Sequence, residues 1–335
     1  MVIKMNKISY LFNRLRNLHL RNLKNTINEI QAITNKSKII IFIDIVWCGL
    51  FYLAGYTDYK IFKMYELKHQ QRKTLLTRGK NNKYIKKLND ANYWHLVHNK
   101  NEFNHHFQEY IQRDWLLITD NFAKFQQFIK NKNYIIAKPP DGSQGIGIEK
   151  IKTKGQQTRE LFNYLCQKNL TLVEEEIIQH DILNKLHPHS VNTLRIITIL
   201  KNKQVHIVTA YLRIGNNNIV DNMTGGGMIA PIDPKNGTIK FPAANKKGDV
   251  FTKHPLTNEH IPGLAIPYWQ EVQNLVYEVP HKVPQLQLIG WDIAITNHGP
   301  QLIEGNQYPA HQSYQLPPHL ENQTGALPKI KNILK

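Results

Sequence analysis

A series of short apolar strands from residue 134 onward constrains the fold of this 335-residue chain most. The segments are rich in β-branched residues or alternate apolar with polar residues, and both patterns are typical of strands. They are residues 134–138, 148–151, 170–174, 193–200, 205–212, 288–296 and 301–304. Helical patterns separate them only at residues 159–167 and 267–277. Strands that dominate in this way predict an α+β body.

The first 110 residues have a different pattern, which predicts a mostly helical domain. Apolar residues recur at helical spacing from Ile8 to Ile30 with basic residues between them, as in a basic amphipathic helix. Such a helix packs on the rest of the protein or lies on an anionic membrane surface, and the sequence leaves both interpretations open. Residues 58–92 are polar and helical in pattern, and the Asn and Lys runs at 79–83 predict a loop between two helices.

An apolar run at residues 39–53 interrupts this basic region. It is shorter than the about 20 residues that a membrane-spanning helix needs, and it contains Asp44. We expect a helix buried in a core, and the alternative is a re-entrant or membrane-embedded segment.

The net charge of +18 is concentrated in the N-terminal third. Residues 1–38 carry +7 and residues 60–90 carry +8, so the rest of the chain is close to neutral. The basic stretches lack interleaved aromatic residues and a groove-reading motif, so we expect no nucleic-acid partner. The two cysteines, Cys48 and Cys166, imply neither a disulfide framework nor a zinc site, which fits a reducing compartment. We therefore expect a cytoplasmic protein whose basic region can lie on the inner face of the membrane.

A lysine followed by glycines is the first motif that carries chemistry. Lys138 ends a predicted strand, and Gly142, Ser143, Gly145 and Gly147 follow within nine residues. Glycines let backbone N–H groups approach phosphate oxygens, and a serine hydroxyl adds a donor. No Gly-Lys-Ser/Thr follows, and the chain continues as a strand rather than a helix, which excludes a Walker loop and a Rossmann fingerprint. The pattern predicts a lysine on one strand and a glycine hairpin that closes over phosphates, although such hairpins are also common without a ligand.

Two acids and an amide form the second motif, near the end of the chain. Asp292 and Glu304 lie on two predicted strands joined by a turn, and Asn306 follows Glu304 by two residues, so both can point to one side. Hard oxygen donors of this kind suit Mg²⁺. An ordinary surface hairpin is the alternative, but the apolar neighbours imply a buried setting in which charges need partners.

Two arginines in predicted strands form the third motif. Arg195 interrupts the apolar strand of the Asn192-Thr-Leu-Arg195 motif, and Arg213 ends the next one. An arginine among core residues binds phosphate or carboxylate bidentately, or it forms a structural salt bridge. The segment Val220-Asp-Asn222 with the glycines after it follows these strands.

In this order the motifs resemble the ATP-grasp superfamily. Residues 192–306 resemble the ribosomal-protein-modifying glutamate ligases and their relatives. The closest resemblance is to the sugar-transfer-associated ATP-grasp proteins, which are encoded with cell-surface polysaccharide genes, and it covers residues 40–315. It rests on Glu-Glu-x-Ile-x-Gln-His at 174–180, Ser190-Val-Asn-Thr-Leu-Arg, Val220-Asp-Asn, Ile289-Gly-Trp-Asp, Asp58-Tyr-Lys-Ile-Phe and Arg72.

The resemblance implies an ATP site. Lys138, and with it Lys100, would contact the phosphates, and residues 142–147 would be the lid. The hinge that reads adenine would consist of Glu174, Glu175 and Ile177. No covalent protein nucleophile is implied.

The resemblance also implies a catalytic centre and a metal site. Arg195 and Arg213 would stabilise charge on the transferring γ-phosphate, and Asn222 would lie near the metal or the phosphates. The acids and amide of the C-terminal hairpin would hold one or two Mg²⁺ ions.

The fold implied is an ATP-grasp fold behind a helical N-terminal domain. We expect a basic helical domain at 1–110, a central subdomain with the lysine and the lid at 111–176, and a C-terminal subdomain with the metal site at 177–335.

The activity implied is an ATP-dependent carboxylate–amine ligase that acts through an acyl phosphate. The gene association suggests the joining of an amino acid to a sugar or uronic acid in cell-surface polysaccharide biosynthesis, with free or glycan-linked substrates. Two alternatives stay open: a kinase that phosphorylates a hydroxyl, and a non-catalytic nucleotide-binding module.

Overall fold

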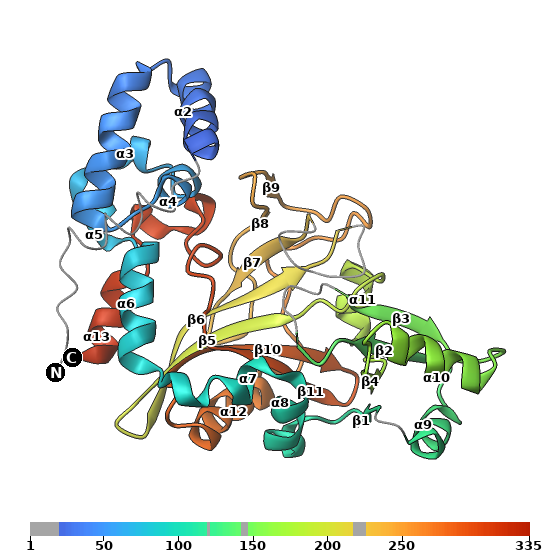
Figure 1. Cartoon of the computed structure of the whole chain (residues 1–335). Helices are drawn as coiled ribbons and strands as arrows, with labels where there is room; N and C mark the ends of the chain where they lie inside the picture. Colours follow the sequence, from blue (N-terminus) through green and yellow to red (C-terminus); the bar gives the residue numbers. More distant parts are fainter. Residues whose placement is uncertain (1–19, 119–120, 142–146, 217–225) are drawn as a thin grey trace. The chain divides into compact units, whose positions relative to one another are not determined.

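The structure is a computed structural model that describes residues 20–118, 121–141, 147–216 and 226–335 (Figure 1). The chain forms two compact units. The first contains Met1–Lys87 and Ala310–Lys335, and the second contains Leu88–Pro309. Residues 88–110 therefore pack with the sheets, and the last residues pack with the first helices. The expected boundary at 176/177 within the second unit stays a prediction.

The first unit is helical. In chain order its helices are α2 (Leu20–Thr34), α3 (Lys38–Tyr52), α4 (Tyr56–Ile61), α5 (His69–Thr74), α6 (Arg78–Leu88) and α13 (Leu327–Leu334). Its core includes Ile30, Ile41 and Phe62, all nearly inaccessible to solvent. The C-terminal segment is tied in by His311 and Gln312, whose side chains both bond Oδ1 of buried Asp58 at 2.9 Å.

Two expectations for this unit need correction. The loop expected at residues 79–83 is wrong, because α6 runs through it. Asn81, Ile85 and Leu88 are buried at helical spacing, and this tertiary packing outweighs the weak helix propensity of the Asn and Gly residues. The apolar run 39–53 forms α3, but only one of its faces is buried. No helix in the described part of the chain combines the length and apolar character that crossing a bilayer requires.

The smaller sheet of the second unit has four antiparallel strands in the order β1-β4-β2-β3. They are β1 (Trp115–Leu117), β2 (Tyr134–Lys138), β3 (Glu149–Lys152) and β4 (Leu172–Glu175). Helices α9 (Phe122–Ile129) and α10 (Thr158–Gln167) accompany the sheet. Phe125 and Leu165 of these helices join Ile135 and Val173 of the strands in one core. Strand β1 escaped the sequence analysis because three residues give no period.

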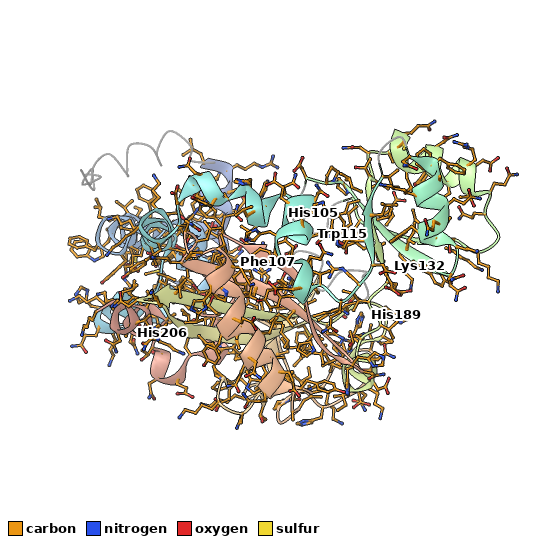
Figure 2. The ribbon with its side chains drawn as sticks, turned by 90° about the horizontal axis from the view of Figure 1, so that it is seen from below. His105, Phe107, Trp115, Lys132, His189 and His206 are labelled. Atoms are coloured by element: carbon orange, nitrogen blue, oxygen red, sulfur yellow. The ribbon has the colours of Figure 1, made fainter. Side chains whose placement is uncertain are left out.

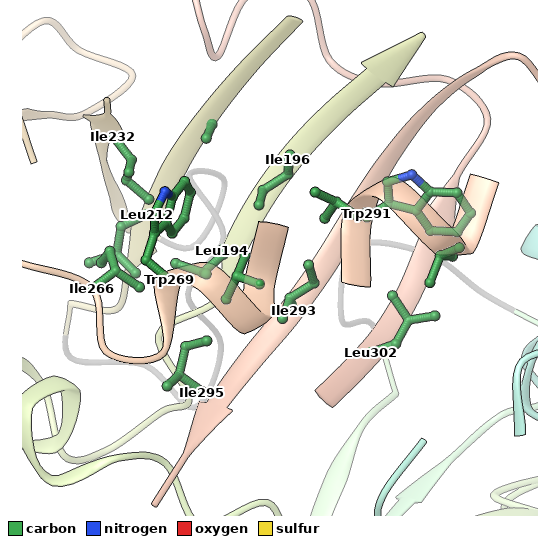
Figure 3. Packing of buried hydrophobic residues seen from close by; sticks show 14 of the residues in the cluster. Leu194, Ile196, Leu212, Ile232, Ile266, Trp269, Trp291, Ile293, Ile295 and Leu302 are labelled. Carbon is green, nitrogen blue, oxygen red and sulfur yellow. The ribbon is translucent and has the colours of Figure 1, made fainter. Parts of the chain in front are cut away.

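The larger sheet has the order β11-β10-β5-β6-β7-β8-β9 and is antiparallel throughout. Its strands are β5 (Leu194–Lys201), β6 (Gln204–Ile214), β7 (Met228–Ile232), β8 (Ala243–Ala244), β9 (Val250–Phe251), β10 (Leu288–Thr296) and β11 (Gly299–Asn306). Helix α12 (Trp269–Glu278) packs on it, and α11 (Asp181–Leu186) contributes Leu183 and Leu186 to the same core. Figure 3 shows Trp291, Ile293 and Leu302 in this core. β7–β9 were not expected from the sequence.

Helix α8 (Lys100–His106), which follows α7 (His95–His98), contacts both sheets. Phe107, just after α8, packs edge-on against Trp291 of β10, with ring centroids 5.6 Å apart. His105 packs edge-on against Trp115 of β1 at 4.6 Å, and Figure 2 labels both rings. These contacts fix Lys100, the first residue of α8, relative to strands of both sheets.

Candidate active site

Glu174 of β4 is the centre of the first charged cluster. Its side chain is 4% exposed, and it accepts hydrogen bonds from Lys138 Nζ at 2.6 Å and Arg113 Nε at 2.8 Å. Asn104 of α8 donates to its other oxygen at 3.1 Å. Burial raises the pKa of Glu174, but Arg113 and Lys138 outweigh burial and hold this pKa well below its usual range. A buried carboxylate with two cations and an amide donor is fully partnered.

Arg113 is a member of this cluster that the sequence analysis missed. Its guanidinium also donates to the carbonyl oxygen of Leu302 at 2.8 Å and to that of Ile303 at 3.5 Å, both on β11. One buried side chain therefore connects the acid of the smaller sheet to the edge strand of the larger one. Arg113 lies between Gln112 and Asp114, just before a three-residue strand that is too short to be recognised, so the sequence contains no clear signal for it.

Lys100, the first residue of α8, contacts the chain between Lys138 and the glycine loop. Its backbone N–H donates to Pro140 O at 3.2 Å and its Nζ to Pro139 O at 3.5 Å, so it lies beside the segment that leads into the glycine loop. Burial, and then the charge of Lys138, lower the pKa of Lys100, while Glu304 and Glu174 raise it. The two carboxylates belong to different sheets, so charges from both sheets act on this one lysine.

The glycine loop lies mostly outside the described residues, which is where Gly142, Ser143 and Gly145 fall. Gly147, at its end, has a φ of +75°, and a Cβ there would lie 3.4 Å from Pro139 Cγ. The left-handed backbone explains why this position favours glycine.

The end of β4 and the loop after it contain the other two expected nucleotide contacts. Glu175 is half-buried, and its backbone N–H bonds Asp114 O at 2.8 Å while its carboxylate accepts from Asp114 N at 3.2 Å. Ile177 is half-buried in the following loop. Glu174 points into the charged cluster, whereas Ile177, the last of the three residues expected in the hinge, lies in the loop.

Asp292 of β10 is the centre of a second cluster and is 2% exposed. It pairs across the sheet with Arg195 of β5, whose Nε and Nη2 donate to its two oxygens, the latter at 2.6 Å. Arg213 of β6 donates to Asp292 Oδ2 at 2.7 Å. Both predicted phosphate-binding arginines therefore bind a carboxylate in this structure, which is the salt-bridge alternative that the sequence left open.

Glu304 of β11 lies opposite Asp292, and a register shift brings it there. Asp292 pairs with Glu304 but Ile293 pairs with Leu302, so Ile303 is an extra residue in β11. This bulge lets Leu302 face the core while Glu304 faces the charged side, two residues that an unbroken strand would place on the same face. The register could not be read from the sequence.

Glu304 is the exposed member of the second cluster. Its side chain is 46% exposed, and its Oε1 lies 3.7 Å from Arg195 Nη2. Burial by its neighbours, together with the charge of Asp292, raises the pKa of Glu304 above its usual range. Two like charges across one strand pair favour the uptake of a proton or a cation.

The remaining predicted residues lie as follows. Asn306 ends β11, is half-buried, and accepts a hydrogen bond from Tyr308 N at 2.8 Å. Asn222 lies outside the described residues. Among the residues that the structure describes, no three His, Cys, Asp or Glu side chains gather as a metal-binding group. The oxygen donors near the hairpin are therefore two carboxylates and one amide.

Gly290 makes room for the second cluster. A Cβ at this position would lie 3.1 Å from Arg195 Cδ and 3.2 Å from Pro309 Cβ. A side chain there would push the arginine away from Asp292, so the glycine of the Ile289-Gly-Trp-Asp motif is needed for space.

A family model described as sugar-transfer associated ATP-grasp matches residues 79–335. The chain belongs to this family. The match begins in α6 and includes both sheets and both charged clusters. The family membership predicted from the motifs is therefore confirmed, as is the α+β ATP-grasp fold behind a helical N-terminal region.

Solved structures give more distant matches. The ATP-grasp ligase PsnB, in complex with a precursor peptide and AMPPNP, has a TM-score of 0.44 at 12% identity, covering 74% of this chain and 61% of its own. D-alanyl-alanine synthetase A from Vibrio cholerae has a TM-score of 0.40 at 13% identity, and the match covers 69% of this chain and 61% of that protein. An L-amino acid ligase from Bacillus licheniformis has a TM-score of 0.39 at 12% identity, and the match covers 69% of this chain and 48% of that protein. The ATP-grasp chain thus spans less than two thirds of each, and the comparison with curated proteins gives no match.

Proposed function

We propose that this protein is an ATP-dependent carboxylate–amine ligase. The observation that carries the proposal is the connection between the two clusters: Arg113 donates to Glu174 of the smaller sheet at 2.8 Å and to the carbonyl oxygen of Leu302, on β11 of the larger sheet, at 2.8 Å. Cations from one sheet and acids from the other, brought within electrostatic reach, suit a polyphosphate bound with a metal ion. Membership of the ATP-grasp family supports ATP as that polyphosphate.

ATP would bind chiefly to the smaller sheet. Lys138 and Lys100 would contact its phosphates, and Gly142, Ser143, Gly145 and Gly147 would close over them as a lid. The backbone of Glu175 and Ile177 would read the adenine, with Glu174 as the buried acid of the hinge. Lys138 would then exchange part of its bond to Glu174 for phosphate oxygens.

Magnesium fits the donor set of the larger sheet. Glu304 is half-exposed and has a raised pKa beside Asp292, so a divalent cation would relieve the repulsion between the two acids. Asp292, Glu304 and Asn306 would hold one or two Mg²⁺ ions. The metal would supply positive charge that stabilises the negative charge on the phosphates.

The reaction has two group transfers. A carboxylate oxygen of the first substrate attacks the γ-phosphorus of ATP, the bond from that phosphorus to the bridging oxygen breaks, and ADP leaves. The amine of the second substrate then attacks the carbonyl carbon of the acyl phosphate. The carbon–oxygen bond to phosphate breaks, inorganic phosphate leaves, and the amine loses a proton. Arg195 and Arg213 would neutralise the oxygens of the transferring group, with Asn222 nearby, and positioning supplies the rest.

The substrates are proposed from the family description. "Sugar-transfer associated" supports an amino acid joined to a sugar or uronic acid, free or glycan-linked, in cell-surface polysaccharide synthesis. Such a role would place the protein in the cytoplasm, with its basic N-terminal region at the inner face of the membrane.

The test is a product analysis with Mg-ATP and panels of amino acids, uronic acids and nucleotide sugars. We expect ADP, phosphate and a new amide in equal amounts, detected by mass spectrometry. A phosphorylated hydroxyl with ADP would show a kinase instead, and no ATP turnover with any pair would favour a non-catalytic module.

Two variants test the site itself. Lys138→Ala should weaken Mg-ATP binding and abolish turnover, and Glu304→Gln should lower turnover by several orders of magnitude because it removes a metal-binding charge. Lys132→Ala is the matched control, since Lys132 lies just before the same strand, β2, and pairs with exposed Asp114. Unchanged ATP affinity of Lys138→Ala in calorimetry would overturn the phosphate assignment.

A further inference from the structure

Helix α3 has two apolar faces, of which only one is buried. Ile41, Ile45 and Cys48 pack into the core of the first unit. Eight large apolar side chains of the same 15-residue helix are exposed, with Ile39 at 70%, Ile43 at 59% and others including Trp47 and Phe51. A contiguous apolar surface of this kind on a folded protein marks a binding surface.

Apart from Lys38, its first residue, helix α3 contains one charged residue, Asp44, which is held on its inner side. Asp44 forms a bidentate pair with Arg72, at 2.6 and 2.8 Å, and accepts a hydrogen bond from Tyr59 OH at 2.7 Å. This network fixes which side of the helix faces the core. From Ile39 to Tyr52 the outer side of the helix therefore carries no charge.

Basic residues border this surface. A groove of about 360 Å³ between α2 and α3 is lined by Leu23, Ile27, Ile39 and Phe42, and Lys24 and Lys38 also line it. Residues 20–87, which belong to the same unit, hold fourteen Lys and Arg against four Asp and Glu.

We propose that the outer face of α3 inserts into the boundary between headgroups and acyl chains of an anionic lipid bilayer. An apolar face with indole and phenyl rings, bordered by cations, is the composition that an interfacial helix needs. At 15 residues the helix is about 22 Å long, shorter than the hydrocarbon core of about 30 Å, so it would lie in the plane of the membrane.

The charge of the unit decides between lipid and a second copy of the chain. Two copies that met through α3 would bring two strongly positive units together, whereas an anionic surface neutralises them. The inference is independent of the proposed ligase activity, because none of its residues belongs to the active site.

The experiment is co-sedimentation of the full chain with phosphatidylcholine vesicles, with and without phosphatidylglycerol, at low and high salt. We expect binding that requires phosphatidylglycerol. The double variant Ile43→Ser with Trp47→Ser should weaken vesicle binding at least tenfold, and this loss should also be seen at low salt. Lys24→Glu with Lys38→Glu should weaken binding most at low salt. The control pair Val250→Ser and Leu256→Ser removes two equally exposed apolar side chains, each 50% exposed, and should leave binding unchanged.

A second measurement distinguishes insertion from loose attraction. Brominated lipids should quench the fluorescence of the wild type more than that of Trp47→Phe, because an inserted indole lies near the acyl chains. Equal quenching, or vesicle binding unaffected by the α3 double variant, would overturn the proposal. A wild-type dimer in sedimentation velocity that the double variant dissociates, without vesicle binding, would overturn it as well.

Discussion

The two buried carboxylates of the candidate active site, Glu174 and Asp292, have similar partners but different surroundings. Each accepts hydrogen bonds from two cationic side chains and is almost fully buried. Glu174 has an amide as its further partner, Asn104, whereas Asp292 lies opposite a second acid, Glu304, that is half-exposed.

This difference separates a closed cluster from an open one. Around Glu174 two cations and an amide donor surround one buried carboxylate, and Arg113 also bonds β11, so this cluster connects the two sheets. Around Asp292 two arginines balance two acids, but Glu304 is half-exposed and lies 3.7 Å from Arg195, so its carboxylate is accessible to a cation. From this comparison we expect Arg113 and Glu174 to contribute mainly to stability and Glu304 mainly to metal binding, and the following variants test it.

Arg113→Met should have the largest effect on stability. It leaves the buried carboxylate of Glu174 with only one cation and removes the two bonds to β11, which should cost about 3–5 kcal/mol. Urea unfolding measures the loss. The control Lys132→Met removes an ion pair whose acid, Asp114, is 69% exposed, and should cost less than about 1 kcal/mol. Equal losses in the two variants would show that the Glu174 cluster is not a structural centre.

Glu174→Gln should cost about 2–3 kcal/mol at pH 7, because it weakens two charge-assisted hydrogen bonds. The pKa of Glu174 is lowered in the folded protein, so its charge stabilises the fold above the ordinary glutamate pKa. That contribution is lost as the pH falls through the folded pKa. The difference in unfolding free energy between wild type and variant should therefore shrink from pH 7 to pH 3. A difference that stays constant would contradict the charge pairing.

Gly290→Ala should have an intermediate effect of about 1–2 kcal/mol, because the added methyl crowds Arg195 and Pro309. We expect turnover to fall by a larger factor than the loss of stability alone would explain, since the displaced arginine belongs to the proposed transfer site. Thermal unfolding and steady-state kinetics on the same preparation compare the two. Wild-type kinetics with full stability would mean that Arg195 has room that the structure does not show.

Glu304→Gln should have the smallest effect on stability, under about 1 kcal/mol, since the side chain is half-exposed and repels Asp292. Its effect on turnover is expected to be large, so the two readouts should separate. A stability loss as large as that of Glu174→Gln would make the second cluster structural too.

Much of the site was predictable from the sequence because local patterns encode it. Charged residues are rarely buried without a partner. A lysine at the end of a strand, an arginine inside one or an acid among apolar residues therefore predicts an oppositely charged group or a ligand nearby. The strand Tyr134–Lys138 and the strand Leu288–Thr296 were predicted to the residue, since β-branched runs bounded by turns have clear periods.

What the sequence determined by itself is the kind of protein: an ATP-grasp chain with a basic helical front and a named set of charged residues. Tertiary structure alone decided which charges pair. Arg113 joins Glu174 from 61 residues away, and an extra residue in β11 turns Glu304 toward Asp292. It also decided that α3 buries one apolar face and exposes the other. Pairing and exposure depend on register and packing between distant segments, which no local pattern specifies.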